Sequence, residues 1–194
     1  MRDGVSDGAE LPRISEACLY SHLITRPTGR AVRMGIEQGL VGRPGPVLTL
    51  VDFRNVAIID FSCADEIVAK LAHAALSCTG PPLRFYLFTG LEEHHLDPVE
   101  SALRRRSLAI TGERADGTPC LLGEADRRLR RPWALVGRLG RATPGSLVPS
   151  CAATTDDARR LLEELHARRL LLRLASEFLS LRAAASATAG GGQR

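Results

Sequence analysis

The sequence predicts an α/β protein whose sheet is built mostly from parallel strands. In residues 13–112, short apolar runs rich in β-formers alternate with segments of helical periodicity. Short connections between alternating strands and helices require right-handed crossovers, which make neighbouring strands parallel. The pattern changes after the turn-rich stretch 113–118, beyond which helices dominate. We therefore expect a second, mainly helical domain in the second half of the chain.

The alternation can be followed along the first half. The expected elements are, in chain order, one or two strands in 13–25, a turn at 26–29 with Thr28 as helix cap, a helix to 41, a strand at 47–53, a helix at 62–76, a strand at 83–88, a helix at 92–106 and a strand at 107–111. The run at 47–53 (VLTLVDF) is almost continuously apolar. Such a run is typical of a strand covered on both faces.

The second half is predicted to be helical and rich in arginine. The expected elements are a helix at 125–141 interrupted at Pro132, a short segment at 143–151, an amphipathic helix at 154–168, a strand or helical continuation at 170–174 and a helix at 175–185. The predicted organisation is a disordered lead-in at 1–12, a sheet domain at 13–113, a helical domain at 120–185 and a flexible tail at 186–194.

Composition and charge narrow the class of protein. The 194 residues are 44% hydrophobic and 25% charged, as in ordinary globular proteins. Residues 1–100 carry a net charge of −4 and residues 101–194 a net charge of +8, an asymmetry that can indicate an acidic or nucleic-acid partner for the second half. Because the five cysteines form no CxxC pair and no apolar run is long enough to span a membrane, we expect a cytoplasmic protein with free thiols.

One segment resembles a known family. Asp52-Phe53-Arg54-Asn55-Val56 is followed by Ile59-Asp60-Phe61-Ser62 and then by Ala64-Asp65-Glu66-Ile67. This succession resembles the STAS domains of bacterial anti-sigma-factor antagonists and, in its last part, an uncharacterised STAS-like family. The resemblance covers residues 28–112. It implies a STAS-like mixed sheet with helices, in a non-enzymatic regulatory protein that acts through protein–protein contact and carries no cofactor.

Ser62 is the candidate switch. The resemblance places it where antagonists are phosphorylated, and it implies a partner such as an anti-sigma-type serine kinase or a histidine-kinase-like ATPase. The residues themselves predict that Ser62 caps a helix and forms a capping box with Asp65. A phosphate at Ser62 would add negative charge beside Asp60 and Asp65 and repel a partner. The predicted partner-binding residues are Asp60, Phe61, Ser62, Cys63 and Asp65.

Other patterns give weaker hypotheses. A small hydrolase using Cys63 or Ser62 is a third possibility, because thiolates are stabilised at helix N-termini. His94 and His95 follow two glutamates, but adjacent histidines point to different helix faces, so we expect a surface helix and no metal site. The chain contains no Gly-rich phosphate loop.

The second half resembles a winged helix-turn-helix over residues 143–173. Its predicted core is formed by Leu161, Leu162, Leu165 and Leu170. The alternative function is therefore a DNA-binding transcriptional regulator. The possible backbone contacts are Arg159, Arg160, Arg168 and Arg169. Asp156 and Asp157 at the start of the same helix would repel phosphate, which favours a helical interaction module.

Overall fold

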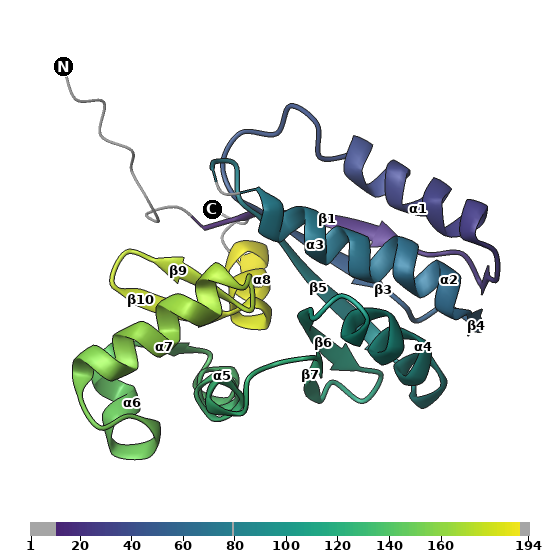
Figure 1. Cartoon of the computed structure of the whole chain (residues 1–194). Coiled ribbons are helices and arrows are strands. Elements are labelled where there is room, and N and C mark those ends of the chain that lie inside the picture. The colour runs from purple at the N-terminus through teal and green to yellow at the C-terminus, as the bar shows by residue number, and fades with distance from the viewer. Residues whose placement is uncertain (1–10, 79, 191–194) are drawn as a thin grey trace.

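The protein is built around a five-stranded mixed sheet. The computed structural model describes residues 11–78 and 80–190 (Figure 1). The strand order is β1-β3-β5-β6-β7, in which the first four strands are parallel to their neighbours and β7 is antiparallel to β6. The strands are β1 (Arg13–Cys18), β3 (Val47–Asp52), β5 (Arg84–Leu91), β6 (Ala109–Arg114) and β7 (Pro119–Gly123). The α/β class and the parallel strands predicted from the sequence are confirmed.

Three helical segments cover one face of this sheet, as Figure 1 shows. The first is α1 (Arg26–Gln38), and the third is α4 (Glu93–Arg104). The second is a continuous run made of α2 (Phe61–Ala64), η1 (Asp65–Ala69) and α3 (Lys70–Ser77). The middle segment is not a uniform α-helix, since η1 is one π-helical turn. A large apolar cluster lies between these helices and the sheet, with Val51, Ile67 and Phe88 fully buried within it.

A short parallel pair of strands lies beside the start of α2. It consists of β2 (His22–Leu23) and β4 (Ile58–Ile59), with His22 opposite Ile58 and Leu23 opposite Ile59. Leu23 and Ile59 are buried, whereas His22 and Ile58 are exposed. This pair holds the loop that follows β3 against the chain that precedes α1.

The second half of the chain forms a smaller α/β arrangement. Its helices are α5 (Arg127–Leu139), α6 (Pro144–Cys151), α7 (Thr155–Ala167) and α8 (Leu181–Gly190), and its strands are β8 (Arg141–Ala142), β9 (Leu171–Leu174) and β10 (Glu177–Ser180). The strands form an antiparallel sheet in the order β8-β10-β9. Leu129, Leu147, Leu162 and Phe178 are buried in the core of this part.

The two halves share buried contacts. Leu172, Leu179 and Leu181 from the second half pack on the second face of the main sheet, against Leu48 and Phe85. Figure 1 shows α8 and the β9–β10 hairpin on that face, opposite α1 and α3. Both faces of the central strands are therefore covered, as the apolar run at 47–53 predicted.

A buried polar contact also joins the halves. The indole nitrogen of Trp133 in α5 donates to the hydroxyl of Thr111 in β6, at 3.2 Å. The Thr111 hydroxyl in turn donates to the carbonyl oxygen of Leu170, also at 3.2 Å. Satisfied hydrogen bonds in a buried position fix the relative placement of these three segments.

Several predicted elements need correction in the first half. The segment 26–29 does not form a loop before the helix, because it is already the first helical turn of α1. The residue that caps this helix is Thr25 and not Thr28, since the Thr25 hydroxyl accepts the amide of Thr28. Pro27 fits there because the first helical turn needs no amide donor at that position. Strand β7 was not predicted from the sequence.

The end of the chain also differs from the prediction. The expected helix at 175–185 is instead strand β10 followed by α8, since Phe178 and Leu179 pair with strands on both sides. Helix α8 extends to Gly190, five residues into the predicted flexible tail, and the Thr188 hydroxyl donates to the carbonyl oxygen of Pro12. Most of the predicted lead-in, residues 1–10, and the last four residues of the tail lie outside the described residues. Within 11–78 and 80–190, no helix combines the length and apolarity needed to cross a membrane.

Candidate functional site

The candidate site lies where β4 leads into α2. The amide of Asp60 donates to the carbonyl oxygen of Leu23 at 2.9 Å, which fixes the chain at the end of the β2–β4 pair. Asp60 has an extended backbone, and the helix begins at the next residue. The helix therefore starts at Phe61, one residue before Ser62.

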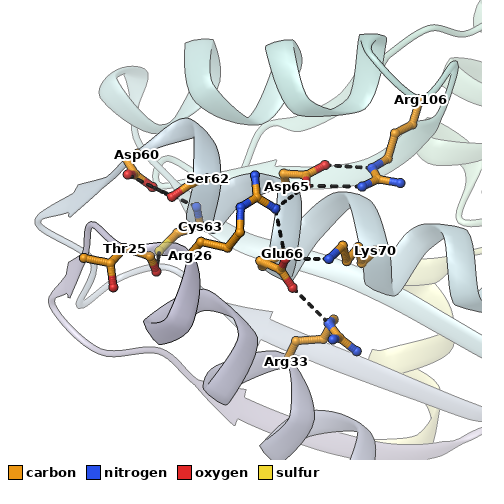
Figure 2. A network of polar contacts seen from close by, with 10 residues as sticks. All are labelled: Thr25, Arg26, Arg33, Asp60, Ser62, Cys63, Asp65, Glu66, Lys70 and Arg106. Atoms are coloured by element: carbon orange, nitrogen blue, oxygen red, sulfur yellow. Dashed lines mark hydrogen bonds and ion pairs between the residues drawn. The ribbon is translucent and has the colours of Figure 1, made fainter.

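Asp60 caps the helix, and Ser62 does not. The Asp60 carboxylate accepts the amide of Cys63 at 2.7 Å, as an N-cap side chain does (Figure 2). Ser62 is the second helical residue, and its hydroxyl donates to the same carboxylate at 2.9 and 3.0 Å. The predicted capping box between Ser62 and Asp65 is wrong. Ser62 is half-buried, and its hydrogen bonds to Asp60 orient its hydroxyl.

Cys63 lies inside the protein. Its side chain is fully buried, and the thiol donates to the carbonyl oxygen of Thr25 at 3.0 Å. Burial and the negative charge of Asp60 raise the pKa of the Cys63 thiol to about 11. The thiol is therefore protonated at neutral pH and cannot act as a thiolate nucleophile. Because it has no exposed surface, Cys63 also cannot touch a partner directly, contrary to its place in the predicted binding set.

The π-helical turn buries two neighbouring carboxylates. Asp65 is 5% exposed and Glu66 is 2% exposed. Burial of a carboxylate is costly unless cations compensate it. Figure 2 shows that four basic side chains surround the pair: Arg26, Arg33, Lys70 and Arg106. Asp65 is thus a buried ion-pair residue, and the sequence-based expectation that it meets a partner at the surface is not met.

The contacts of the two carboxylates are unequal. The Arg106 guanidinium grips Asp65 through two hydrogen bonds, Nε to Oδ1 at 2.7 Å and Nη2 to Oδ2 at 3.2 Å. Arg26 bridges both acids, at 3.1 Å from Asp65 and 3.0 Å from Glu66. Lys70 also bonds Glu66, and the Arg33 Nε lies 3.6 Å from Glu66 Oε2 without a hydrogen bond.

These cations keep both acids ionised. The hydrogen bonds from Arg106 lower the pKa of Asp65, against the opposing effect of burial. For Glu66 burial raises the pKa, but the hydrogen bonds from Lys70 and Arg26 outweigh it, and the pKa is lowered. Of the four cations around the two carboxylates, Arg33 pairs more closely with Glu37, at 2.6 Å, and the Arg26 side chain is 50% exposed.

Helix α1 approaches the candidate site as closely as the backbone permits. A Cβ atom at Gly29 would lie 2.9 Å from the Cα of Cys63 and 3.0 Å from the Cβ of Glu66. Only glycine fits such a contact without displacement of the neighbouring backbone. The approach of α1 brings Thr25 to the Cys63 thiol and Arg26 to the acidic pair.

Large apolar side chains are exposed around this helix start. The exposed fractions are 70% for Tyr20, 50% for Ile24 and 45% for Ile58. All three lie in or next to the β2–β4 pair. Phe61, the first residue of α2, is half-buried beneath the Arg105 guanidinium, 5.8 Å from its ring centre. We call Tyr20, Ile24, Ile58 and Phe61 the apolar patch.

No family model and no curated protein matches this chain.

Sequence reasoning missed the role of His95. The side chain is fully buried, and not on a helix surface as expected. Its Nδ1 accepts the amide of Glu92 at 3.0 Å, and its Nε2 donates to the carbonyl oxygen of Val56 at 2.8 Å. Burial lowers the pKa of His95, consistent with a neutral ring. His95 thus ties α4 to the loop that positions β4. The adjacent His94 is exposed, as expected.

The structure also places the residues of the two other kinds of site considered from the sequence. Within these residues, no three His, Cys, Asp or Glu side chains form a group able to hold a metal ion. Three of the four arginines predicted to contact DNA have partners within the protein. Arg159 and Arg160 are exposed early on α7, and Arg160 lies 3.6 Å from Asp157. Arg168 pairs with Glu164, and Arg169 turns back to bond the Cys78 carbonyl oxygen and lie over Phe85.

Proposed function

We propose that this chain is a non-enzymatic bacterial regulatory protein that acts by protein–protein contact through a STAS-like domain, with Ser62 as its switch. The observation that carries the proposal is the Ser62 hydroxyl, which is half-buried at the start of α2, held by Asp60 and bordered by the apolar patch. The hydroxyl comes after β3 of the main sheet, a loop and the short strand β4, an order that supports the STAS resemblance.

The apolar patch supplies the surface for a partner. Stable protein interfaces place apolar and aromatic side chains at their centre and polar groups at the rim. Tyr20, Ile24 and Ile58 provide exposed apolar area, and Asp60 and Ser62 lie at its border. The partner that the resemblance implies is an anti-sigma-type serine kinase or a histidine-kinase-like ATPase.

Phosphorylation of Ser62 would change this border electrostatically. The Ser62 oxygen now donates its proton to Asp60. A phosphate removes that donor and adds a charge of about −1.5 to −2 at neutral pH. Two like charges about 4 Å apart near a protein surface repel by roughly 4 kcal/mol before salt screening. The phosphoserine side chain must therefore turn away from Asp60 towards solvent. A partner docked on this surface would then have to bury the phosphate without a compensating charge.

The second half supports a winged-helix-like arrangement as part of this proposal. Its succession of a helix, a short strand, two helices and a hairpin, with sheet order β8-β10-β9, supports the assignment of a three-stranded wing beside a helix-turn-helix. The β9–β10 hairpin is buried on both faces, since Phe178 packs in one core and Leu179 in another. A hairpin so covered suits a structural and interaction role better than insertion into a groove.

The test combines modification mapping with matched charge variants. Mass spectrometry of the protein isolated from its host should find phosphate on Ser62. Affinity capture should recover one ATP-binding partner with the wild type and lose it with Ser62→Glu and with Ile58→Asp. Ser77→Glu is the control, because it adds the same charge at the exposed far end of the same helical run. Absence of phosphate under all growth conditions, together with identical captured proteins for wild type and Ser62→Glu, would disprove the switch.

A further inference from the structure

A row of arginines follows the exposed face of α5. Arg127, Arg131 and Arg138 are separated by four and seven residues, with Arg130 beside them and Ala134 between them. Residues at these spacings lie on one side of a helix. All four arginines are exposed. At 1.5 Å per residue the row is about 16 Å long. We call Arg127, Arg130, Arg131 and Arg138 the α5 row.

The α5 row is not neutralised by acidic neighbours. In the part of the chain that the structure describes, none of its four arginines forms an ion pair, whereas Arg128 on the flank of the helix pairs with both Asp126 and Glu164. From residue 127 to residue 155 the sequence contains six arginines and no aspartate or glutamate. This stretch therefore accounts for much of the basic excess of the second half.

A hollow lies within the row. It measures about 250 Å³ and is lined by Arg131, Ala134, Leu135, Arg138 and Ser150. The small side chain of Ala134 leaves space between the two guanidinium groups, and exposed Ser150, at the end of α6, lies opposite. An anionic group in this hollow would meet two arginines and a hydroxyl.

We propose that the α5 row binds the phosphodiester backbone of nucleic acid without reading its sequence. Guanidinium groups match phosphate oxygens in a planar, bidentate geometry. Duplex DNA carries one charge per ~1.7 Å of axis, so a 16 Å row faces a continuous track of phosphates. The row contains no large apolar anchor of the kind that protein interfaces use, and the half-exposed Leu139 points about 100° away from Arg138 around the helix.

This site is distinct from the one predicted from the sequence. The expected DNA contacts on α7 share their surface with Asp156, Asp157 and Glu163. Phosphate would therefore meet acidic side chains on α7 and none on the α5 row. The inference is also independent of the Ser62 switch, because the α5 row makes no use of the apolar patch.

Fluorescence anisotropy with a labelled 24-base-pair duplex of arbitrary sequence tests the proposal. If the four arginines neutralise about four phosphates, the slope of log K against log salt is about −3.6, and affinity falls on the order of 100-fold between 50 and 200 mM salt. The double variant Arg131→Gln/Arg138→Gln should weaken binding and make the slope about 2 units shallower. The matched control Arg159→Gln/Arg160→Gln removes the same charge from α7 and should leave the slope unchanged.

The binding measurements distinguish recognition of the DNA backbone from other uses of the α5 row. Equal binding of a second, unrelated duplex supports backbone recognition. The proposal is overturned if the wild type does not bind at 50 mM salt, if the α7 pair lowers the slope while the α5 pair does not, or if poly-glutamate of equal charge competes as well as DNA. Circular dichroism and thermal melting of both double variants establish that each is folded, so that a loss of binding reports on the surface.

Discussion

The contact between α1 and the candidate site can be measured with two glycines of the same helix. A side chain at Gly29 would lie within 3.0 Å of Cys63 and Glu66, whereas one at Gly35 would meet nothing within 4 Å. Replacing a glycine inside a helix by alanine gains about 1 kcal/mol in helix propensity at either position. Only at Gly29 is this gain opposed by overpacking, which costs about 1–3 kcal/mol.

We therefore expect opposite results for the two substitutions. Gly35→Ala should raise the free energy of unfolding by about 1 kcal/mol. The free energy of unfolding of Gly29→Ala should be lower than that of Gly35→Ala by about 1–3 kcal/mol. The new methyl group would meet backbone and Cβ atoms, which cannot rotate away. In thermal melting the difference corresponds to roughly 2–4 °C for each kcal/mol in a chain of this size.

Urea denaturation at pH 7, followed by far-UV circular dichroism, gives both free energies. The two variants share the same helix and the same chemical change, so differences in the unfolded chain largely cancel. If Gly29→Ala stabilises the protein as much as Gly35→Ala does, α1 does not approach the π-helical turn as closely as described. The placement of Arg26 over the acidic pair would then be wrong as well.

Three further predictions concern buried polar groups. Because the pKa of Asp65 is lowered in the folded protein, its ionised carboxylate stabilises the fold fully above the pKa of the unfolded chain, about 4, and this stabilisation is lost as the pH falls below that value. In urea titrations from pH 6 to pH 2, the free energy of unfolding should therefore fall less steeply for Asp65→Asn than for the wild type. His95→Phe removes the partner of the Glu92 amide and of the buried Val56 carbonyl oxygen, and it should cost about 1–3 kcal/mol in urea denaturation. His94→Phe at the exposed neighbour should stay within about 0.5 kcal/mol. Trp133→Phe removes the hydrogen bond to Thr111 and should lower the melting temperature by the equivalent of about 1 kcal/mol.

Local patterns predicted most of the sheet and its covering helices. The apolar run at 47–53 and the helical stripe after residue 62 are properties of contiguous residues, and both were confirmed as elements. Strand β10 was mistaken for helix because its four residues show no clear period. Pairing with β8 and β9 makes it a strand, and that pairing is invisible along the chain.

The sequence indicated the position of the candidate site, but not the hydrogen bonds and ion pairs within it. Asp60 and Ser62 are both good cap residues, and the bond from the Cys63 amide to the Asp60 carboxylate shows which one caps the helix. The cations that neutralise Asp65 come from positions 26 and 106, about forty residues away on either side. His95 had a faint local signal, since it lies three residues after Glu92 at a helix start, where a side chain can reach back to the cap.

The shared core restricts how the two proposed surfaces can influence one another. Allosteric coupling needs an element with two arrangements that both sites bias. Between the Ser62 region and the α5 row lie the main sheet, the cluster of Leu48, Phe85 and Leu179, and the buried bond from Trp133 to Thr111. A packed core of this kind resists graded deformation. If both surfaces are used, a phosphate on Ser62 would therefore control nucleic-acid binding by retaining or releasing a partner, and in the isolated protein Ser62→Glu should leave the affinity of the α5 row for DNA unchanged.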